Sequence, residues 1–453
     1  MIYCAHMKAV LLAAGRSFRT KPIEDKNFLS FCGKYLIEHQ ILALLHAGFT
    51  DIAVIGGAHN ISKLAEVTAE ILKQHKRISI IVLEQKKLDE GMAGAVMSAE
   101  KFVGDTPFLV VSSNDVLDSR SFELIKKQVK GVSGKIKKDV ENKPIGFLLA
   151  KKVSEYFPGG YLKLAKNGSI STIVEKPGDG NEPSDLVNIV VHYHANSIAL
   201  FEALKSEKSS RDDRYEKALQ SLFDDGIEYR AIAFDGFWQP VKYPWHVLDV
   251  MDYFMSRTRK AVRGKNVAVA KSATIKGSVF LDDGVRVFEN AVISGPAYIG
   301  KNTIIANGAL VRGSNIGENS VIGFGSEIAR SYIGCGVWTH TNYIGDSIVG
   351  NNVSFGSGAV TGNFRLDEGF ISVNCSNEKV SSKRDKLGLI TGDDIRCGIN
   401  TSFMPGVRIG SNCAIGAGIV ISEDVPENSY VSGEYSLKIV SNKVKILPRN
   451  RKV

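Results

Sequence analysis

A six-residue repeat in the second half of the chain constrains the fold more than any other feature of the sequence. From Val269 to Val311 an aliphatic residue recurs at every sixth position, eight times in strict register. Most of these residues are followed, four positions later, by a small or branched residue such as Ala273 or Val279. Neither an α-helix nor a β-strand has this period. A short fixed period predicts stacked units, each of which buries its aliphatic residue against the next.

The repeat loosens after Val311, breaks at residues 361–390 and resumes at Ile409. Glycine often follows the aliphatic residue, as in Ile299-Gly300. Units of this kind resemble the hexapeptide repeat of left-handed parallel β-helices. The resemblance implies triangular coils of three units and, for most such proteins, a homotrimer with acyl-CoA sites between neighbouring subunits. A β-helix that serves only as a trimerisation scaffold is the alternative.

The first half alternates short apolar runs with helical patterns. Strands are expected at residues 9–12, 51–55, 78–83, 108–112, 146–150 and 187–192, and helices at 34–47 and 61–75. This alternation favours a doubly wound, Rossmann-like mixed α/β sheet with helices on both faces, which binds ligands at the carboxyl ends of its strands. Because glycine becomes denser beyond residue 263, we expect an α/β domain at 1–250, a linker helix at 251–265, a β-helix at 266–435 and a basic tail at 436–453.

Composition argues against several classes of function. The 453 residues contain no long uninterrupted apolar run, so no membrane-spanning helix is expected. Six dispersed cysteines form no C-x-x-C pair, which argues against a zinc or redox motif. The net charge of +9 reflects basic residues in the tail and at 126–138 that no aromatic residues interleave, so nucleic-acid binding is not expected. The N-terminus lacks the pattern of a signal peptide, and we expect a cytoplasmic protein.

A glycine loop leads out of the first expected strand. Its sequence is Leu12-Ala13-Ala14-Gly15-Arg16-Ser17-Phe18-Arg19, followed by Asp25-Lys26-Asn27-Phe28-Leu29 and by Gly33-Lys34-Tyr35-Leu36-Ile37-Glu38-His39. Such a loop presents backbone N–H groups to phosphate oxygens, and arginine and lysine side chains add compensating charge. The pattern therefore favours a polyphosphate site at the end of the first strand.

The order of these segments resembles the sugar-1-phosphate nucleotidylyltransferases, which read L-A-A-G-x-G-[TS]-R, then P-K-x-L, then G-K-P-[LM]-I-E-H. Later matches include Gly91-Met92-Ala93, Asn114-Asp115 and Glu175-Lys176-Pro177. The resemblance implies that Arg19 and Lys26 hold the triphosphate during catalysis and that Asp115 binds Mg²⁺. It also implies nucleotide binding by Ala13, Ala14, Gly15, Gln85 and Gly91, and sugar-phosphate binding by Gly160, Glu175, Lys176 and Asn188.

The implied reaction is nucleotidyl transfer. A sugar-1-phosphate oxygen attacks the α-phosphorus of a nucleoside triphosphate in line and pyrophosphate leaves, which requires positioning and charge neutralisation but no covalent nucleophile. Four positions depart from the family pattern. Ser17 and Phe18 replace the second glycine and the Thr/Ser of the loop, Asp25 replaces the proline before Lys26, and Pro240 stands where many members have a second magnesium-binding aspartate. A domain that keeps the fold without the activity is the alternative.

The second half carries the motif Thr-His-Thr-Asn-Tyr-Ile-Gly-Asp-Ser at residues 339–347. With segments at 356–363, 383–388 and 398–406, it resembles the acetyltransferase half of bifunctional enzymes that make UDP-N-acetylglucosamine, especially the archaeal type. The resemblance implies that His340 is the catalytic base, a role that suits the side chain type that titrates nearest to neutral pH. It also implies that Tyr343, Asn363 and Lys386 position the sugar phosphate or CoA. The lysine that relatives carry after Asn-x-Arg-x-Asp is absent from residues 363–369.

The sequence thus predicts a bifunctional, cytoplasmic homotrimer of nucleotide-sugar synthesis. We expect acetyl transfer from acetyl-CoA to an amino-sugar-1-phosphate, glucosamine-1-phosphate in the leading hypothesis. We also expect Mg²⁺-dependent nucleotidyl transfer from UTP to N-acetylglucosamine-1-phosphate. No nucleic-acid or membrane partner is expected. The alternatives are a single-activity pyrophosphorylase with a scaffold β-helix and a catalytically silent regulatory subunit that binds sugar nucleotides.

Overall fold

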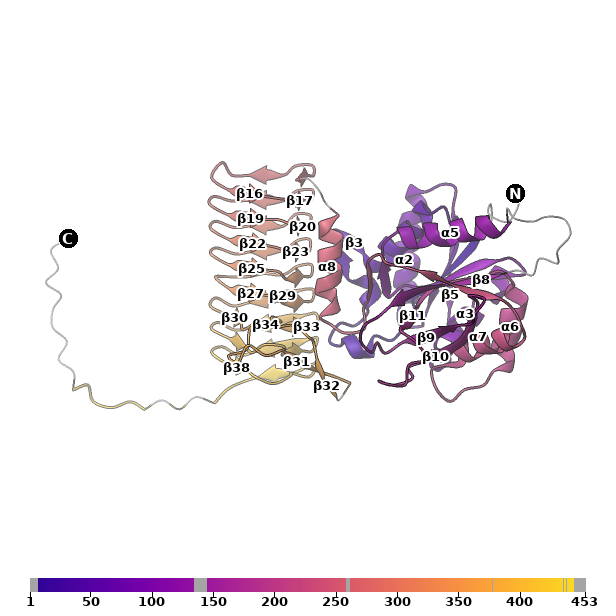
Figure 1. Cartoon of the computed structure of the whole chain (residues 1–453). Helices are drawn as coiled ribbons and strands as arrows, with labels where there is room; N and C mark the ends of the chain where they lie inside the picture. The colour runs from indigo at the N-terminus through magenta and orange to yellow at the C-terminus, as the bar shows by residue number, and fades with distance from the viewer. Residues whose placement is uncertain are drawn as a thin grey trace.

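The chain folds into an α/β half and a column of stacked coils, with one helix, α8 (His246–Ser256), between them (Figure 1). The computed structural model describes residues 7–133, 145–257, 261–376, 378–434, 436 and 438–443. Most of the predicted basic tail and part of the basic stretch at 126–138 therefore lie outside the described residues. Within the described residues, no helix combines the length and the apolar character that crossing a membrane requires.

The α/β half is built on a nine-stranded mixed sheet. Its strands are β1 (Lys8–Leu12), β4 (Asp51–Gly56), β5 (Ser79–Glu84), β6 (Phe108–Ser112), β8 (Gly146–Lys152), β9 (Gly160–Leu164), β10 (Ile170–Glu175), β11 (Leu186–His194) and β12 (Tyr229–Ala233). The order is β10-β9-β11-β6-β1-β4-β5, and β8 pairs with β11 and β12. β1 is parallel to β4 and β6, whereas β11 is antiparallel to β6 and β8. The six strands predicted from the sequence are all present.

Helices cover both faces of this sheet, as the alternating pattern predicts. One face packs against α1 (Leu36–His46), α2 (Ile61–Gln74) and α5 (Arg120–Ser133), and the other against α3 (Gly91–Met97), α6 (Ser197–Ser206) and α7 (Arg214–Asp224). The neighbours Val10 and Leu11 in β1 belong to the two opposite cores, because successive strand side chains alternate between faces. Helix α1 begins at Leu36 rather than at 34, since β2 (Ser30–Phe31) and β3 (Lys34–Tyr35) form a hairpin before it.

Short elements complete the α/β half near the ends of its central strands. They are η1 (Phe18–Thr20), η2 (Lys26–Phe28), η3 (Leu88–Glu90), α4 (Glu100–Val103), β7 (Asp115–Leu117) and β13 (Trp238–Pro240). β7 and β13 pair antiparallel with each other, outside the main sheet. This pairing brings the closing segment after residue 237 back to the carboxyl end of β6.

The second half is a left-handed parallel β-helix with three sheet faces. The first face consists of β14 (Val262–Arg263), β17 (Val279–Leu281), β20 (Ala297–Ile299), β23 (Asn315–Ile316), β26 (Tyr332–Ile333), β28 (Ile348–Val349), β33 (Ile390–Thr391) and β36 (Arg408–Ile409). The second consists of β15 (Ala268–Val269), β18 (Arg286–Val287), β21 (Ile304–Ile305), β24 (Val321–Ile322), β29 (Val353–Phe355), β34 (Ile395–Cys397), β37 (Cys413–Ile415) and β39 (Tyr430–Val431). The third consists of β16 (Thr274–Lys276), β19 (Val292–Ser294), β22 (Leu310–Arg312), β25 (Glu327–Ala329), β27 (Tyr343–Gly345), β30 (Val360–Thr361), β35 (Ser402–Phe403) and β38 (Val420–Ile421).

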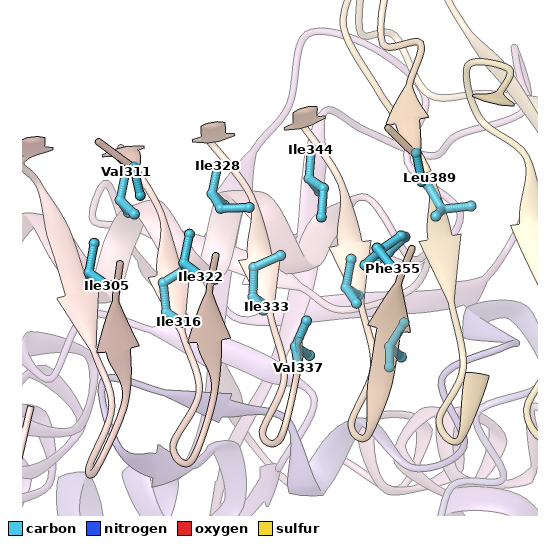
Figure 2. Packing of buried hydrophobic residues seen from close by; sticks show 14 of the residues in the cluster. Ile305, Val311, Ile316, Ile322, Ile328, Ile333, Val337, Ile344, Phe355 and Leu389 are labelled. Atoms are coloured by element: carbon cyan, nitrogen blue, oxygen red, sulfur yellow. The ribbon is translucent and has the colours of Figure 1, made fainter. Parts of the chain in front are cut away.

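The six-residue repeat supplies the core of this column. Every repeat residue from Leu281 to Val311 is at most 1% exposed, and the next turns continue the stack with Ile316, Ile322 and Ile328 (Figure 2). The prediction of stacked units is therefore confirmed. The interruption at 361–390 is an inserted excursion that contains the hairpin β31 (Ser372–Cys375) and β32 (Glu378–Ser381).

An apolar core joins the two halves. It combines Phe31 of β2, Trp245 and Met251 around α8, Tyr332 of the first β-helix face and Ile371 beside the inserted hairpin. Hydrogen bonds cross the same junction: the Ser30 N–H donates to Tyr332 Oη at 2.9 Å, and the Cys32 N–H donates to Asn315 Oδ1 at 2.9 Å. The β-helix thus holds the hairpin that follows the glycine loop. The division at 1–250, 251–265 and 266–435 stays a prediction, with α8 ending at Ser256 and the first column strand beginning at Val262.

Candidate active sites

A cavity of about 480 Å³ lies at the carboxyl ends of β1, β5 and β6. Four of the predicted nucleotide-binding residues line it, namely Ala14, Gly15, Gln85 and Gly91. The fifth, Ala13, is fully buried beneath it. Strand ends at one edge of a doubly wound sheet converge in space, so residues far apart in the chain come to share this cavity.

Asp25, which replaces a family proline, anchors the glycine loop from below. Its Oδ1 accepts the Asn27 N–H at 2.8 Å, and its Oδ2 accepts the Asn60 Nδ2–H at 2.7 Å. The same two asparagine side chains donate to the Ala13 carbonyl, at 3.0 Å from Asn27 and 2.9 Å from Asn60. A proline at position 25 would restrict the backbone directly, whereas Asp25 holds the loop through these hydrogen bonds.

Ser17, which replaces the second glycine of the loop, adopts the left-handed conformation that glycine favours. Its φ is +55°, and its carbonyl accepts hydrogen bonds from the Thr20 N–H at 3.0 Å and the Thr20 hydroxyl at 2.8 Å. A non-glycine residue in this region costs about 1–2 kcal/mol. At position 17 the loop thus has the left-handed conformation that a glycine would readily adopt. Phe18, 63% exposed, lines the cavity.

Gln85 is 4% exposed, and its amide nitrogen is committed within the chain. Nε2 donates to the Lys87 carbonyl at 3.0 Å and to the Gly91 carbonyl at 2.8 Å. An amide nitrogen has two hydrogens, so only the acceptor Oε1 is left for a ligand. Gln85 holds the segment before α3 in place and can accept one hydrogen bond from a base edge.

Two lysines face the buried carboxyl group of Asp115 at the start of β7. Burial raises the pKa of Asp115. Lys242, the Trp238 Nε1–H that donates to Oδ1 at 3.2 Å, and Lys26 each lower this pKa and so offset part of the rise. Burial lowers the pKa of both Lys26 and Lys242 to about 8, and Arg19 adds to the lowering at each. Lys26 Nζ also donates to the Val241 carbonyl at 3.2 Å. The predicted triphosphate ligand Lys26 thus lies near Asp115, and the second one, Arg19, lies close enough to both lysines to lower their pKa values.

The residues around Asp115 fit Mg²⁺ only in part. No group of three or more His, Cys, Asp or Glu side chains suited to a metal ion occurs in the parts of the chain that the structure describes. Next to Asp115 in the sequence, the buried Oδ1 of Asn114 has no hydrogen-bond partner among the residues that the structure describes, and Asn114 lines the nucleotide cavity. Mg²⁺ takes oxygen ligands and often completes its shell with substrate phosphates and water. Asp115 and Asn114 Oδ1 would therefore supply two protein oxygens to such a shell, with phosphates and water supplying the rest.

The predicted sugar-phosphate residues converge at the β9–β10 pair. Gly160 pairs with Glu175 across the two strands, and a Cβ at Gly160 would lie 3.3 Å from Glu175 Oε2 and 3.6 Å from Asn188 Nδ2. Lys176 Nζ lies 2.9 Å from Glu175 Oε1. Glycine at 160 leaves room for a ligand between these polar groups. The structure therefore brings all four residues together.

In the β-helix, three predicted or motif residues form one polar cluster. Asp346, 5% exposed, accepts from Arg330 through Nε at 2.7 Å and Nη2 at 2.6 Å. Asn363 Nδ2 donates to Asp346 Oδ2 at 2.5 Å and to Tyr343 Oη at 3.2 Å. Tyr343 and Asn363 are thus brought together, whereas Lys386 is exposed and pairs through its backbone with Phe364.

His340 is exposed at the turn between the second and third faces of the β-helix. Asn342 fixes this turn: its Oδ1 accepts the His340 N–H at 2.5 Å, and its Nδ2 donates to the carbonyls of Gly356 at 2.8 Å and Ala359 at 3.0 Å. No ring hydrogen bond of His340 occurs within the described residues. The imidazole is therefore presented to solvent on a rigid turn, where a ligand or a second chain can reach it.

Several polar residues at these sites were not predicted from the sequence. Asp212 lines the nucleotide cavity next to Gly91, and Glu216 of α7 has its pKa raised to about 8 by burial and then by Glu175. Lys242 and Arg330 were also missed. Lys242 lies in the closing segment that the motif flagged, so its charge was a usable signal. The other three become site residues only through contacts distant in sequence.

Comparisons with known proteins show the family to which the chain belongs. Residues 8–242 match the nucleotidyl transferase family. The "Bifunctional protein GlmU" of Methanocaldococcus jannaschii is 31% identical to this chain, over 94% of this chain and 97% of its own length. The protein of the same name from Methanococcus maripaludis is 32% identical, over 96% of this chain and 100% of its own.

A third relative, the "bifunctional sugar-1-phosphate nucleotidylyltransferase/acetyltransferase" of Sulfurisphaera tokodaii, is 32% identical over 92% of this chain and 98% of its own length. The protein thus consists of a nucleotidyl transferase domain followed by a β-helix of hexapeptide repeats. The chain belongs to the family of bifunctional sugar-1-phosphate nucleotidylyltransferases/acetyltransferases. The family and the fold class predicted from the sequence are both confirmed.

Proposed function

We propose that this chain makes UDP-N-acetylglucosamine in two steps, with each half carrying one of them. The β-helix would acetylate glucosamine-1-phosphate from acetyl-CoA, and the α/β half would couple the product to UTP with release of pyrophosphate. The observation that carries the proposal is the pair of convergent sites on one chain whose relatives match it along nearly its whole length.

In the α/β half, Arg19, Lys26 and Lys242 would neutralise the triphosphate at the moment when charge moves onto pyrophosphate. Positioning and charge neutralisation are the main requirements of phosphoryl and nucleotidyl transfer. Asp115, with Asn114 Oδ1, would hold Mg²⁺, which supplies additional positive charge to the phosphate oxygens. Gly160, Glu175, Lys176 and Asn188 would hold the sugar phosphate so that its oxygen points at the α-phosphorus.

In the β-helix, His340 would take the proton from the attacking sugar amine as it adds to the thioester carbonyl, and CoA would leave as the thiol. Tyr343, Asn363 and Lys386 would hold the sugar phosphate or CoA. The exposed apolar side chains near His340, with Phe324 68%, Trp338 51% and Ile399 54% exposed, support a homotrimer in which a neighbouring β-helix covers this edge. UTP and acetyl-CoA are cytoplasmic metabolites, which supports a cytoplasmic location.

Acetyl transfer is tested with purified protein, glucosamine-1-phosphate and acetyl-CoA, by following the free thiol. We expect release that disappears in His340→Ala and persists in His46→Ala, which removes a histidine of α1 far along the chain. Absence of release from a folded wild-type protein would leave the β-helix a scaffold. Light scattering should give a mass three times the 49.3 kDa of one chain.

Nucleotidyl transfer is tested separately, with UTP, N-acetylglucosamine-1-phosphate and Mg²⁺, by following pyrophosphate. We expect release that is lost in Asp115→Asn and unaffected by His340→Ala. Pyrophosphate release in the absence of thiol release would identify a single-activity pyrophosphorylase. Binding of UDP-sugar without either product would identify a regulatory subunit.

A further inference from the structure

A continuous chain of hydrogen bonds runs from Asn188 of the sugar-phosphate site into the core. Asn188 Oδ1 lies 2.8 Å from His192 Nε2, and His192 Nδ1 lies 2.9 Å from the Tyr215 hydroxyl. The same hydroxyl lies 2.9 Å from His194 Nε2, and His194 Nδ1 lies 2.8 Å from the Tyr229 hydroxyl. We call these five side chains the relay.

The relay connects two strands of the sheet, β11 and β12, with the helix α7 that packs on them. Asn188, His192 and His194 come from β11, on alternate positions that share one face of the sheet, whereas Tyr215 comes from α7 and Tyr229 from β12. Both histidines are fully buried, and burial lowers the pKa of His192 to about 3 and that of His194 well below its usual value. Each imidazole is therefore neutral, with one N–H donor and one acceptor nitrogen.

The Tyr229 hydroxyl, at the end of the relay opposite Asn188, determines which group donates in each hydrogen bond. The relay contains four contacts and four protons, one on each imidazole and one on each hydroxyl. The Tyr229 hydroxyl, in a side chain 2% exposed, has its only hydrogen bond among the described residues with His194. If it accepted there, its own proton would be buried without an acceptor, which folded proteins avoid. It therefore donates to His194 Nδ1.

That one assignment fixes all the others. His194 must carry its proton on Nε2 and donate it to Tyr215, so the Tyr215 hydroxyl donates to His192 Nδ1. His192 then carries its proton on Nε2 and donates to Asn188 Oδ1. With Oδ1 accepting from the core, the Asn188 amide presents Nδ2 toward Gly160 and Glu175.

We propose that the relay fixes the Asn188 amide so that its NH₂ group, and not its oxygen, faces the sugar-phosphate site. His192, Tyr215, His194 and Tyr229 are positioning residues, because they act on the substrate only through Asn188. An NH₂ group donates to hydroxyl or phosphate oxygens, whereas an amide oxygen would repel the phosphate. The link to substrate rests on the proposed nucleotidyl transfer, but the direction of the relay does not.

The direction is tested without any substrate, by the ¹⁵N spectrum of histidine-labelled full-length protein, assigned with His192→Gln and His194→Gln. We expect both rings to be protonated on Nε2 alone. In Tyr229→Phe the terminal donor is lost, so we expect both tautomers of His192 to be populated, although Tyr229 does not touch His192. Tyr332→Phe removes another buried tyrosine hydroxyl, at the junction of the two halves, and should leave the His192 signals unchanged. A His192 protonated on Nδ1, or a tautomer unaffected by Tyr229→Phe, would overturn the relay.

The consequence for substrate is tested by a double-mutant cycle. Asn188→Asp keeps the acceptor for His192 and replaces the NH₂ group by oxygen, so we expect the KM for the sugar phosphate to rise roughly tenfold or more. Tyr229→Phe should raise this KM about twofold, the effect of halving the correctly oriented population, and leave the KM for UTP unchanged. In the Asn188→Asp background Tyr229→Phe should have no further effect, because a carboxylate has no wrong orientation.

Equal effects of Tyr229→Phe in both backgrounds would indicate packing instead and overturn the positioning role. A wild-type protein that turns over no sugar phosphate would overturn the proposed function, and the link between the relay and substrate with it. The tautomer spectra would still decide the direction of the relay in that case, so the two failures are distinguishable.

Discussion

Pro240 lies directly opposite Asp115 in the antiparallel pairing of β13 with β7. Directly opposed residues have Cβ atoms about 4.5–5.5 Å apart. A carboxylate at position 240 would therefore reach an ion bound by Asp115. This agrees with the family resemblance, in which many members have a second magnesium-binding aspartate at this position. With proline there, this strand pair contributes the Asp115 carboxylate alone, and Lys242, two residues further on, adds a positive charge beside it.

Replacing Pro240 by aspartate should restore a second metal-binding carboxylate. In Pro240→Asp we expect the Mg²⁺ concentration for half-maximal pyrophosphate release to fall about tenfold, equivalent to roughly 1.4 kcal/mol of added binding. Without metal, two buried carboxylates would repel each other, so the apo-protein should melt at a lower temperature than the wild type. The matched control is Gln239→Asp, because side chains alternate along a strand and this one points away from Asp115. An equal gain in the control would contradict the assignment.

The two lysines with lowered pKa values give the α/β site a defined pH dependence. Below pH about 8 both Lys26 and Lys242 are protonated and attract the triphosphate, and as pH rises through 8 they lose that charge. We therefore expect kcat/KM for UTP, which reports groups of the free enzyme, to fall above pH about 8.

The number of titrating groups can be read from the slope of that decline. With two groups, kcat/KM should fall by up to about a hundredfold per pH unit, and in Lys242→Met by about tenfold. Lys163→Met, which removes an exposed lysine of β9, is the control and should keep the wild-type slope. A slope that Lys242→Met leaves unchanged would exclude Lys242 from the triphosphate site.

Periodicity and motif order were enough to predict the fold, because both can be recognised from short stretches of sequence. The six-residue spacing from Val269 corresponds to one buried residue per face of the column, and the apolar runs at 9–12 and 108–112 became β1 and β6. The predicted sugar-phosphate residues were brought together because the family motif preserves their order. Their roles stay predictions, since only contacts and not ligands define them.

The missed site residues share one property: their partners are distant in sequence. Glu216 is an ordinary charge on α7 until burial and Glu175 raise its pKa. His192 was predicted only as part of the strand at 187–192, and the predicted strand ended before His194. The hydrogen-bond relay through Tyr215 and Tyr229 depends on how α7 and β12 pack on β11. No local pattern encodes that packing.

The charge of Asp346 should matter to acetyl transfer and not to nucleotidyl transfer. Asp346→Asn breaks a two-point contact with Arg330 and the acceptor that orients Asn363. Because Asp346 is buried and the Arg330 side chain is 38% exposed, we expect a loss of about 1–3 kcal/mol in the free energy of unfolding, below the value for a fully buried pair. Thiol release should fall while pyrophosphate release persists.

The stability control for this variant is Asp367→Asn, which breaks an Arg365–Asp367 pair of the same two-point geometry. Its side chains are 43% and 62% exposed, so we expect no measurable loss of stability in denaturant unfolding. A comparable loss in both variants would show that burial does not distinguish the two pairs. Loss of pyrophosphate release in Asp346→Asn would show that the variant has disturbed the whole protein.

The insertion at 361–390, which contains the hairpin, should stabilise the junction between the halves. Ile371, 2% exposed, packs in the apolar core with Trp245 and Met251, so Ile371→Ala deletes buried volume at the contact of the β-helix with α8. We expect a loss of about 2–4 kcal/mol in the free energy of unfolding, the range for large-to-small core substitutions. Ile198→Ala makes the same chemical change at a residue 54% exposed on α6 and should cost less than about 0.5 kcal/mol. Equal losses of unfolding free energy for the two variants in urea would mean that the insertion does not stabilise the junction. A large loss confined to Ile371→Ala would show that it does.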